Sequence, residues 1–380
     1  MRLTAVSLAA VALAACSTSD NAVAQNDNRP FTVTPMADFK EPWAMTFIPG
    51  TASALVTEKK GQLMLWQEGS PAKVVTGTPA VAVGGQGGLG DVVVAPDYAT
   101  SKAVYLSWVE AGPDDTRGAV VGRFTLDLSG PAPRLTNMTR IWEQTPKVTG
   151  TGHFSHRIAF SRDGKYLFIG SGERQKFDPA QDMKANLGKI VRLYPDGRIP
   201  EDNPWRNQKA PTNQIWSLGH RNILGIAFDD RGNLWAQEMG PKGGDELNVV
   251  YRKGNYGYPK VSNGDHYDGR PIPDHAPGDG FIAPVLWWNP AISPGGLAYY
   301  NADLFPEWQQ SLFLGGLGAQ ALIRVKLGTG QRAEKADQWP MGARIREVEV
   351  GPEGALWLLE DGRDGSQGRL LRLTPKVAAN

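Results

Sequence analysis

The segment 219–248 combines groups that suit an anion with groups that suit a hard cation. It begins with a cation and an amide side by side, Arg221 and Asn222, and such groups bind anions through strong hydrogen bonds. A strand, a turn and a second strand follow, and the segment then reaches Gly240-Pro241. A tight turn of this kind presents backbone carbonyls, which calcium accepts as ligands. The segment therefore predicts an anion-binding strip joined by one hairpin to a candidate calcium turn.

Two carboxylates, Asp245 and Glu246, follow this turn and would stand behind its carbonyls. The spacing is not that of an EF-hand loop, and it matches no zinc site. A glycine-rich turn without metal accounts for the same residues, so both interpretations stay open on the sequence alone.

A second group of cations occurs near the C-terminus, where the sequence reads Arg344-Ile-Arg346. Alternate residues of a strand point to the same face, so the two guanidiniums would form a fork. Together with Arg221 they would place three cations at one site. Buried cations without partners are costly, so a polyanionic ligand would account for them. Pairing with Asp or Glu from the same loops is the alternative.

His153 is the candidate proton acceptor, because it belongs to the sequence Gly-His-Phe-Ser-His in a chain with 5 histidines. Histidine is the side chain that accepts protons most readily near neutral pH. A hydrogen-bonded structural histidine is the alternative. Gln86 lies in the glycine-rich segment 84–90, which lacks the Lys-Ser/Thr of a phosphate loop and would instead direct an amide toward the same place.

These candidate residues occupy equivalent places in a repeated pattern. A strand, a Gly/Pro/Asp turn and a second strand recur six times, at a period of about 45 to 70 residues. The first strands begin at residues 44, 91, 157, 225, 296 and 347. Further apolar strands follow, most clearly at residues 62–66, 189–193, 322–327 and 369–373. The pattern predicts an all-β fold, a six-bladed β-propeller with four-stranded antiparallel blades, rather than a pair of β-sandwiches.

A propeller would bring these residues together, because its innermost strands surround one channel and the loops at one end form the site. The composition agrees with this fold, since 45 glycines and 12 tryptophans among 380 residues are typical of many short strands joined by tight turns. Lys+Arg number 40 and Asp+Glu 39, so no diffuse positive field would hold nucleic acid.

The N-terminal residues 1–15 have the features of a lipoprotein-type signal peptide, with Arg2 followed by an apolar stretch too short to span a bilayer. Cys16, the single cysteine, stands where lipidation would occur, although an ordinary signal peptide with an incidental cysteine is the alternative. Ser17 after the cysteine favours sorting to the outer membrane. We expect an exported protein anchored by lipid and facing the periplasm, with a flexible tether (16–30) and a single propeller domain (31–378).

Taken together, the motifs resemble the soluble glucose dehydrogenase and aldose sugar dehydrogenase family, quinoproteins that use pyrroloquinoline quinone (PQQ) and calcium. The motifs are GHRN (219–222), GP…DE (240–246), GNYGYP (254–259), LGKIVRLYPDGRIPEDNP (187–204), RxR (344–346) and the pair His153 and Arg157. The resemblance covers essentially the whole chain after the signal peptide, and it implies a six-bladed propeller independently of the repeats.

The resemblance implies oxidation of aldose sugars to lactones, with hydride transfer from C1 to the quinone and His153 as general base. It assigns Arg221 to both catalysis and cofactor binding. The other cofactor-binding residues that it implies are Asn222, Arg344, Arg346 and Gln86.

The resemblance also implies metal-binding and supporting residues. The carbonyls of Gly240 and Pro241 would bind the catalytic calcium, with Asp245 behind them, and Arg157 would support the substrate or the base. Glu246 and the carbonyl of Tyr256 would hold a second, structural calcium. The partners would be an aldose and an electron acceptor that no motif identifies.

Two positions depart from the glucose dehydrogenases. Segment 315–320 lacks their cofactor-binding lysine, and Ala291 stands where they have a threonine. The aldose dehydrogenase branch is therefore the nearer one. A calcium-dependent propeller lactonase or hydrolase, and a non-catalytic propeller that binds sugars or proteins, are the alternatives.

Overall fold

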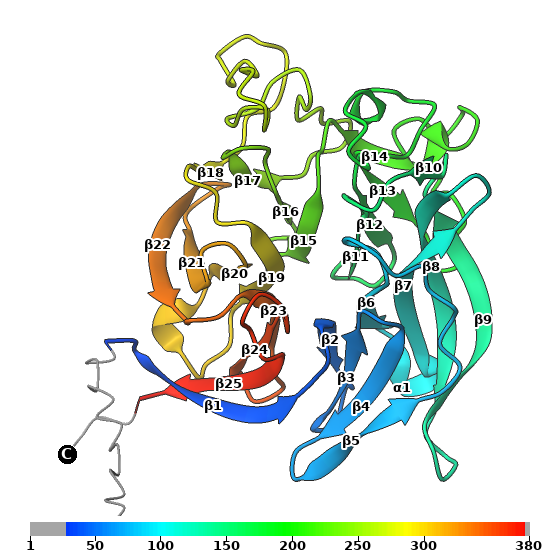
Figure 1. Cartoon of the computed structure of the whole chain (residues 1–380), viewed down its shortest axis with the longest axis vertical. Helices are drawn as coiled ribbons and strands as arrows, with labels where there is room; N and C mark the ends of the chain where they lie inside the picture. Colours follow the sequence, from blue (N-terminus) through cyan, green and yellow to red (C-terminus); the bar gives the residue numbers. More distant parts are fainter. Residues whose placement is uncertain (1–27, 377–380) are drawn as a thin grey trace, which may run out of the picture.

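The six repeated units form six antiparallel sheets around a central axis (Figure 1) in the computed structural model, which describes residues 28–376. The predicted signal peptide and Cys16 lie outside the described residues. Each repeated unit supplies the two innermost strands of one blade, so the predicted β-propeller is confirmed.

Every blade runs from an innermost strand at the channel to an outermost strand. In that order, the first blade contains β2 (Pro42–Phe47), β3 (Ser53–Glu58), β4 (Gln62–Gln67) and β5 (Ser70–Val75). The second contains β6 (Leu89–Val94), β7 (Ala103–Ala111), β8 (Thr116–Asp127) and β9 (Arg134–Glu143). The third contains β11 (Ser155–Phe160), β12 (Leu167–Ser171), β13 (Lys189–Leu193) and β14 (Ile215–Leu218).

The remaining blades repeat this order. The fourth contains β15 (Ile223–Phe228), β16 (Leu234–Glu238), β17 (Asp245–Val249) and β18 (Leu286–Trp288). The fifth contains β19 (Pro294–Tyr300), β20 (Ser311–Gly316), β21 (Ala321–Leu327) and β22 (Ala333–Pro340). The sixth contains β23 (Ile345–Val350), β24 (Leu356–Glu360), β25 (Arg369–Pro375) and β1 (Phe31–Asp38). The second blade differs from the prediction, because the short β10 (Val148–Thr149) also pairs with β8.

The ring is closed by its own first strand, because β1 pairs antiparallel with β25 from Phe31↔Pro375 to Asp38↔Arg369. The ring of Phe31 is fully buried and lies edge-on against Trp308 at 5.7 Å. The first and last strands of the described chain thus share one sheet, and β1 covers the edge that β25 would otherwise expose.

The core lies between neighbouring blades, so most strands are buried on both faces. In β20, Leu312 and Leu314 belong to the apolar cluster that includes Trp235 of the fourth blade. Phe313 points the other way, into the cluster that includes Leu358 of the sixth blade. A strand buried on both faces is a continuous apolar run rather than an alternating one, as the sequence of β20 shows.

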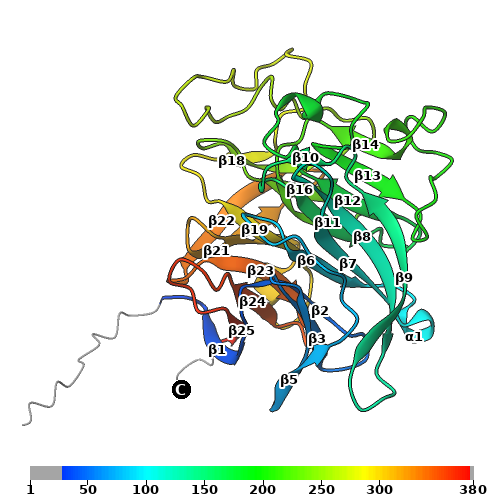
Figure 2. The same ribbon diagram turned by 45° about the vertical axis from the view of Figure 1, so that its right-hand side comes forward.

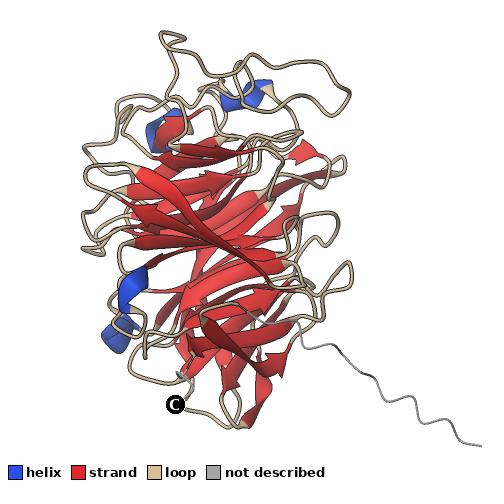
Figure 3. Cartoon of the chain, turned by 90° about the vertical axis from the view of Figure 1, so that its left-hand side faces the viewer, coloured by secondary structure: helices blue, strands red, loops and turns tan. Residues whose placement is uncertain are grey.

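Helical structure is confined to short pieces (Figure 3). They are α1 (Tyr98–Ser101), η1 (Asp178–Ala180), η2 (Thr212–Gln214) and η3 (Pro306–Trp308). Within residues 28–376 no helix has the length and apolar character needed to span a membrane. The long segment 250–285 between β17 and β18 extends beyond the sheets, and it is drawn in yellow-green at the top of Figures 1 and 2.

Candidate active site at the mouth of the channel

Each blade sends two loops to the end of the channel where the inner strands begin, which we call the mouth. One loop precedes the inner strand, and the other connects the second strand to the third. In the third blade these loops carry His153 and Glu173, and in the fourth they carry Arg221 and Gly240. The antiparallel order of the blades therefore brings these four residues to the same end of the propeller.

His153 and Glu173 form a buried pair at the mouth. Nδ1 of His153 is hydrogen-bonded to Oε1 of Glu173, and both side chains are almost fully buried. The other carboxylate oxygen accepts the backbone N–H groups of Lys176 (2.6 Å) and Phe177 (2.7 Å). An ionised carboxylate can only accept hydrogen bonds, so the imidazole proton of His153 belongs on Nδ1. The lone pair on Nε2 of His153 is then the basic site.

The electrostatics of this pair keep the imidazole neutral and the carboxylate ionised. Burial lowers the pKa of His153 below 6.5, the hydrogen bond to Glu173 opposes this, and the charge of Arg221 lowers it further. Burial alone would raise the pKa of Glu173. The hydrogen bond from His153, the backbone donors and Arg221 instead bring it below its ordinary value. Such a pair is ready to accept a proton at neutral pH.

The loops that carry this pair contain non-glycine residues in the left-handed region. His153 has φ 49°, Ser155 has φ 58° and Arg174 has φ 64°. Such conformations cost about 1–3 kcal/mol each and persist where the surroundings fix them, often at functional sites. Arg174 supplies part of that support, because its guanidinium donates to the carbonyls of Gly152 (2.8 Å) and Gly150 (2.6 Å).

Arg221 lies beside the pair and reaches the predicted calcium turn. Its Nη1 donates to the carbonyls of Met239 (2.9 Å) and Gly240 (2.6 Å), and its guanidinium carbon lies 5.8 Å from the ring centres of Tyr258 and Tyr267. Its buried Nε has no hydrogen-bond partner among the described residues. A buried donor without an acceptor indicates that the site is completed by another group.

Asn222 and Gln86 connect the loops of three blades. Asn222 is fully buried, accepts a hydrogen bond from Ser155 (3.2 Å) and donates a long one to Gln86 (3.5 Å). The same oxygen of Gln86 accepts the backbone N–H of His153 at 2.8 Å. Both amides therefore fix the position of the base, and Gln86 does so while lining the cavity described below.

Arg344 and Arg346 point to the same side of the sixth blade, as predicted, but they share an acidic partner. One oxygen of Asp361 accepts a hydrogen bond from Nε of Arg344 (2.9 Å). The other oxygen accepts two hydrogen bonds from the guanidinium of Arg346 (2.8 and 2.6 Å). Internal pairing, the alternative that the sequence left open, thus applies to these two residues. Asp361 serves both guanidiniums, and Arg344 also lies 3.7 Å from the exposed Asp364.

Two cavities lie side by side at the mouth. The smaller, about 250 Å³, is lined by His153, Glu173, Arg221 and Pro241 together with aromatic residues of the third and fourth blades. The larger, about 320 Å³, is lined by residues of the first, second, third, fourth, fifth and sixth blades. These residues are Trp43, Lys59, Gly85, Gln86, Phe154, Ser155, His156, Leu224, Met239, Leu317, Arg344, Arg346 and Arg363. The expected single funnel with three guanidiniums is therefore divided, because Arg221 faces the smaller cavity and the other two face the larger.

Arg157 is predicted to support the substrate or the base, but its hydrogen bonds go to residues other than His153 and Glu173. It belongs to β11 and points into the channel, where its guanidinium pairs with Asp91 (3.3 Å) and Glu347 and donates to the carbonyl of Leu224 (2.7 Å). It lines a separate cavity of about 110 Å³ below the mouth. These contacts join the second, third and sixth blades through one guanidinium. Burial raises the pKa of Glu347 to about 7, and the charge of Arg157 opposes that rise.

The predicted calcium turn is present, but its first carbonyl already has a donor. A side chain at Gly240 would collide with the carbonyls of Gly243 and Gly244 at 2.3 Å, so the turn packs several carbonyls closely. Asp245 accepts the N–H of Gly240 (2.9 Å) and that of Ser293 (2.7 Å), so it supports the turn from behind. A calcium ion on the Gly240 carbonyl would compete with Arg221 for it.

The surroundings of Glu246 offer a second place for a cation. Glu246 and Glu238 lie close enough that burial and the second charge raise the pKa of Glu246 well above 4.5. Close by, Oδ1 of Asn248 is buried without a hydrogen-bond partner among the described residues. The ring nitrogens of His275 lie 3.5 Å from Asp279 and 4.0 Å from Glu246. No group of three or more His, Cys, Asp or Glu residues in segment 28–376 is arranged to hold a metal, so amide and carbonyl oxygens would have to contribute.

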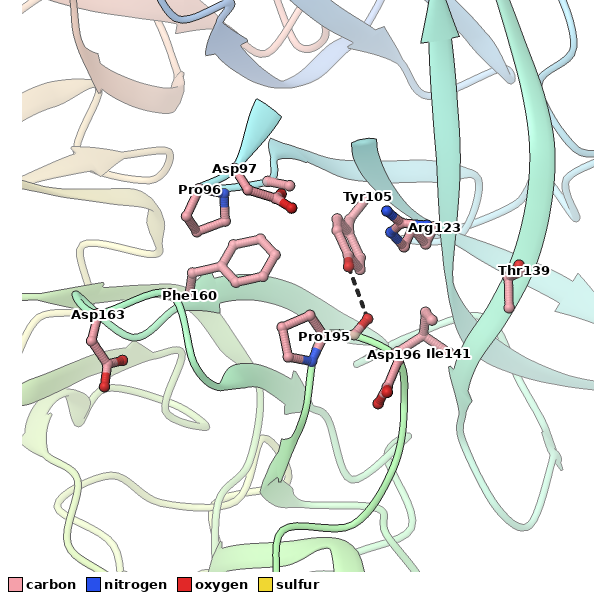
Figure 4. Close-up of a pocket in the computed structure, with 12 residues that line it drawn as sticks. Pro96, Asp97, Tyr105, Arg123, Thr139, Ile141, Phe160, Asp163, Pro195 and Asp196 are labelled. Atoms are coloured by element: carbon pink, nitrogen blue, oxygen red, sulfur yellow. Dashed lines mark hydrogen bonds between the residues drawn. The ribbon is translucent and has the colours of Figure 1, made fainter. Parts of the chain in front are cut away.

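A cavity of about 780 Å³ lies at the opposite end, between the second and third blades (Figure 4). Part of its lining, at residues 95–97 and 163–164, follows the ends of β6 and β11, whereas the mouth residues precede the beginnings of these strands. Two of its carboxylates already have partners. Asp97 accepts a hydrogen bond from the hydroxyl of Ser101, and Asp196 forms an ion pair with Arg198. The chemically distinctive groups are therefore those of the mouth.

Among the mouth residues that escaped the sequence interpretation are Glu173, Lys59 and Asp361. Each follows the second strand of its blade by one or two positions, at residues 173, 59 and 361. The repeats could have identified them, because the loop after the second strand reaches the mouth in every blade. The sequence interpretation drew candidate residues from that loop only in the fourth blade.

Comparisons with known proteins agree with this geometry. The family model described as "Glucose / Sorbosone dehydrogenase" matches residues 39–372. A protein of Escherichia coli (strain K12) named "Aldose sugar dehydrogenase YliI" is 40% identical over 344 residues, which are 88% of this chain and 90% of that protein.

Solved structures are similar over nearly the whole chain. The apo-form of the soluble aldose sugar dehydrogenase from Escherichia coli has a TM-score of 0.85 and 37% identity, and the match covers 91% of this chain and 100% of that one. The PQQ-bound form of an aldose sugar dehydrogenase from Streptomyces coelicolor has a TM-score of 0.75 and 28% identity. That match covers 91% of this chain and 98% of the other.

Proposed function

The chain belongs to the glucose/sorbosone dehydrogenase family, and from this premise we propose that it oxidises aldose sugars to lactones with PQQ as cofactor. The observation that carries the proposal is the pairing of His153 with Glu173 beside a cavity with a positively charged wall. The PQQ-bound relative supports the choice of cofactor.

The residues of the larger cavity fit a flat polyanion. Trp43 and His156 stack at 5.0 Å with an angle of 11°, so their rings are nearly parallel in its wall. The charged residues among those that line it are all cations, and an anionic ligand would neutralise them through charge-assisted hydrogen bonds. A volume of about 320 Å³ lies within the range of small-molecule sites.

The protein's part in the reaction would be to orient the sugar and to accept one proton. When bound, PQQ supplies the acceptor for the hydride that leaves C1 of the sugar. His153 would take the proton of the C1 hydroxyl at Nε2, and the C1–O bond becomes the carbonyl of the lactone. Glu173 would then stabilise the imidazolium, and a positioned base of this kind contributes about 10²- to 10⁴-fold to the rate.

The aromatic residues around the smaller cavity would exclude water and contact the sugar. Phe177 and Tyr267 line this cavity, yet they are 43% and 73% exposed. Exposed aromatic faces beside a polar base suit a sugar ring, which presents C–H groups on its faces and hydroxyls at its edge. This arrangement supports an aldose as the substrate.

Calcium is part of the proposal at two places. At the mouth it would use the carbonyls of Gly240 and Pro241, where it would compete with Arg221 for the first of them. Calcium binding at this turn is therefore expected to depend on the anionic cofactor, which would offset the positive charges of the calcium ion and of Arg221. The second place is beside Glu246, where the unpartnered oxygen of Asn248 supports a structural ion with the carbonyl of Tyr256.

The proposal extends to where the enzyme works. Residues 1–15 and Cys16 would direct export and lipidation, and the propeller would face the periplasm from the outer membrane. Mass spectrometry of the N-terminal peptide from membranes tests this point. A Cys16→Ser protein that stays in the membrane fraction would contradict it.

The experiment that tests the activity is reconstitution of the purified protein with PQQ and calcium. We expect dye reduction with glucose or other aldoses, and bleaching of the quinone absorption when sugar is added without dye. A protein that binds no quinone and reduces no dye would overturn the proposal. Hydrolysis of lactones in the absence of quinone would instead support the hydrolase alternative.

A further inference from the structure

The larger cavity at the mouth contains two cations that neither the motifs nor the resemblance assigned, Lys59 and Arg363. Lys59 belongs to the turn between β3 and β4 of the first blade, and Arg363 belongs to the loop between β24 and β25 of the sixth. They join Arg344 and Arg346, so four positive charges from two neighbouring blades line one side of the site.

The acids near this wall do not balance its charge. Both oxygens of Asp361 are used by Arg344 and Arg346, and Arg344 also lies 3.7 Å from the exposed Asp364. The hydrogen bond of Lys59 goes to a neutral group, the carbonyl of Gly85 at 2.5 Å. Nε of Arg363 lies 3.8 Å from Glu41, which also pairs with an exposed lysine. The wall thus keeps an excess of positive charge that faces the cavity.

The pKa of Lys59 reflects the excess of positive charge in this wall. Burial lowers the pKa of Lys59, and the charges of Arg363 and Arg346 lower it further, against the opposite influence of Glu41 and Asp361. Cations held close together in a partly buried wall repel one another, and a bound anion relieves that repulsion.

The position of Lys59 is fixed by the backbone around it. Its N–H donates to the carbonyl of Glu41 (3.0 Å), and its own carbonyl accepts the N–H of Leu89 (3.0 Å). Gly88 has φ 137°, and a side chain there would lie 2.1 Å from the Lys59 carbonyl and 2.9 Å from its Cγ. The chain of the second blade therefore passes directly against the stem of Lys59 and directs it toward the cavity.

We propose that Lys59 and Arg363, with Arg344 and Arg346, hold the carboxylates of the quinone cofactor, so that the first and sixth blades supply the positive charge that segment 315–320 lacks. In that segment of the fifth blade the residue that lines the cavity is Leu317, which has no charge. This inference rests on the proposed function and assigns a role to residues that the proposal does not require.

Titration of the apo protein with PQQ tests the inference, with quenching of intrinsic fluorescence as the readout. We expect Lys59→Gln to raise the Kd for PQQ about 10- to 100-fold, the effect of one charge-assisted hydrogen bond. Arg363→Gln should act in the same direction, and Lys59→Arg should restore most of the affinity. Lys60→Gln is the matched control, because the Lys60 side chain is 69% exposed and pairs with Glu41 outside the cavity.

A second ligand separates charge recognition from shape. The trimethyl ester of PQQ keeps the ring system without the carboxylate charges, so Lys59→Gln should not weaken its binding. The Kd of the wild-type protein for PQQ should also rise more steeply with salt than that of Lys59→Gln. Melting temperatures of the variants close to that of the wild-type protein would show that the fold is intact.

The possible failures are distinguishable. Wild-type protein that binds no PQQ would overturn the proposed function and this inference together. Wild-type protein that binds PQQ, with Lys59→Gln and Arg363→Gln no weaker than Lys60→Gln, would overturn the inference alone. Equal weakening of PQQ and its ester by Lys59→Gln would also overturn it, because the effect would then not depend on carboxylate charge.

Discussion

Replacing Glu173 by glutamine changes the protonation of the base with almost no change in shape. In the wild-type protein one oxygen of Glu173 accepts from His153, and the other accepts two backbone N–H groups. Glutamine has a single acceptor oxygen. If its NH₂ group faced the backbone donors, buried donors would be left unsatisfied, at a cost of about 1–3 kcal/mol each. The oxygen is therefore expected to stay with the backbone, and the NH₂ group to face Nδ1 of His153.

This orientation makes Nδ1 the acceptor and moves the imidazole proton to Nε2, the atom that should take the proton of the sugar. We expect kcat of Glu173→Gln to fall about 10²- to 10⁴-fold, the range of general-base catalysis. The Kd for PQQ should change little, because Glu173 lines the smaller cavity and not the larger one.

The pH profile gives a second and independent check. Because burial lowers the pKa of His153, the activity of the wild-type enzyme should fall on acidification only below pH 6.5. Glu173 raises that pKa, so any residual activity of Glu173→Gln should be lost at still lower pH. Glu143→Gln, which changes a carboxylate that is 47% exposed, is the control and should keep both kcat and the profile. A kcat of Glu173→Gln within threefold of the wild type, with an unchanged acid limb, would refute the reasoning.

Three further predictions concern stability and metal binding. Phe31→Ala should lower the free energy of unfolding by about 3–5 kcal/mol, measured in guanidinium, because it removes a fully buried ring at the closure of the propeller; a loss below 1 kcal/mol would contradict this. Burial lowers the pKa of His156 to about 3, so on acidification the unfolded chain takes up its proton first. The contribution of His156 to stability should then fall by about 1.4 kcal/mol per pH unit below pH 6.5, and the difference between wild type and His156→Gln should shrink over that interval. Calcium should raise the melting temperature of the apo protein, and Glu246→Gln should abolish most of that rise; an equal rise in the variant would place the structural ion elsewhere.

The fold followed from the sequence because its determinants are local and repeated. Each unit consists of two apolar strands and a turn of glycine, proline or aspartate, and six such units predict six blades. The equivalence of the blades also placed His153, Arg221 and Arg344 at one end of the channel. The closing pair β1 and β25 was not predicted, since it joins residues from opposite ends of the chain and no local pattern links them.

The partners of the charged residues were decided by the tertiary structure alone. Arg157 pairs with Glu347, a residue 190 positions away, so it points into the channel and does not serve the base. Lys59 and Arg363 come together because the propeller places its first and last blades side by side, and neither belongs to a motif. The sequence determined which chemical groups reach the mouth, because strand period and turn position are local properties. Which group neutralises, orients or opposes another depends on distances between blades, and only the closed ring fixes those distances.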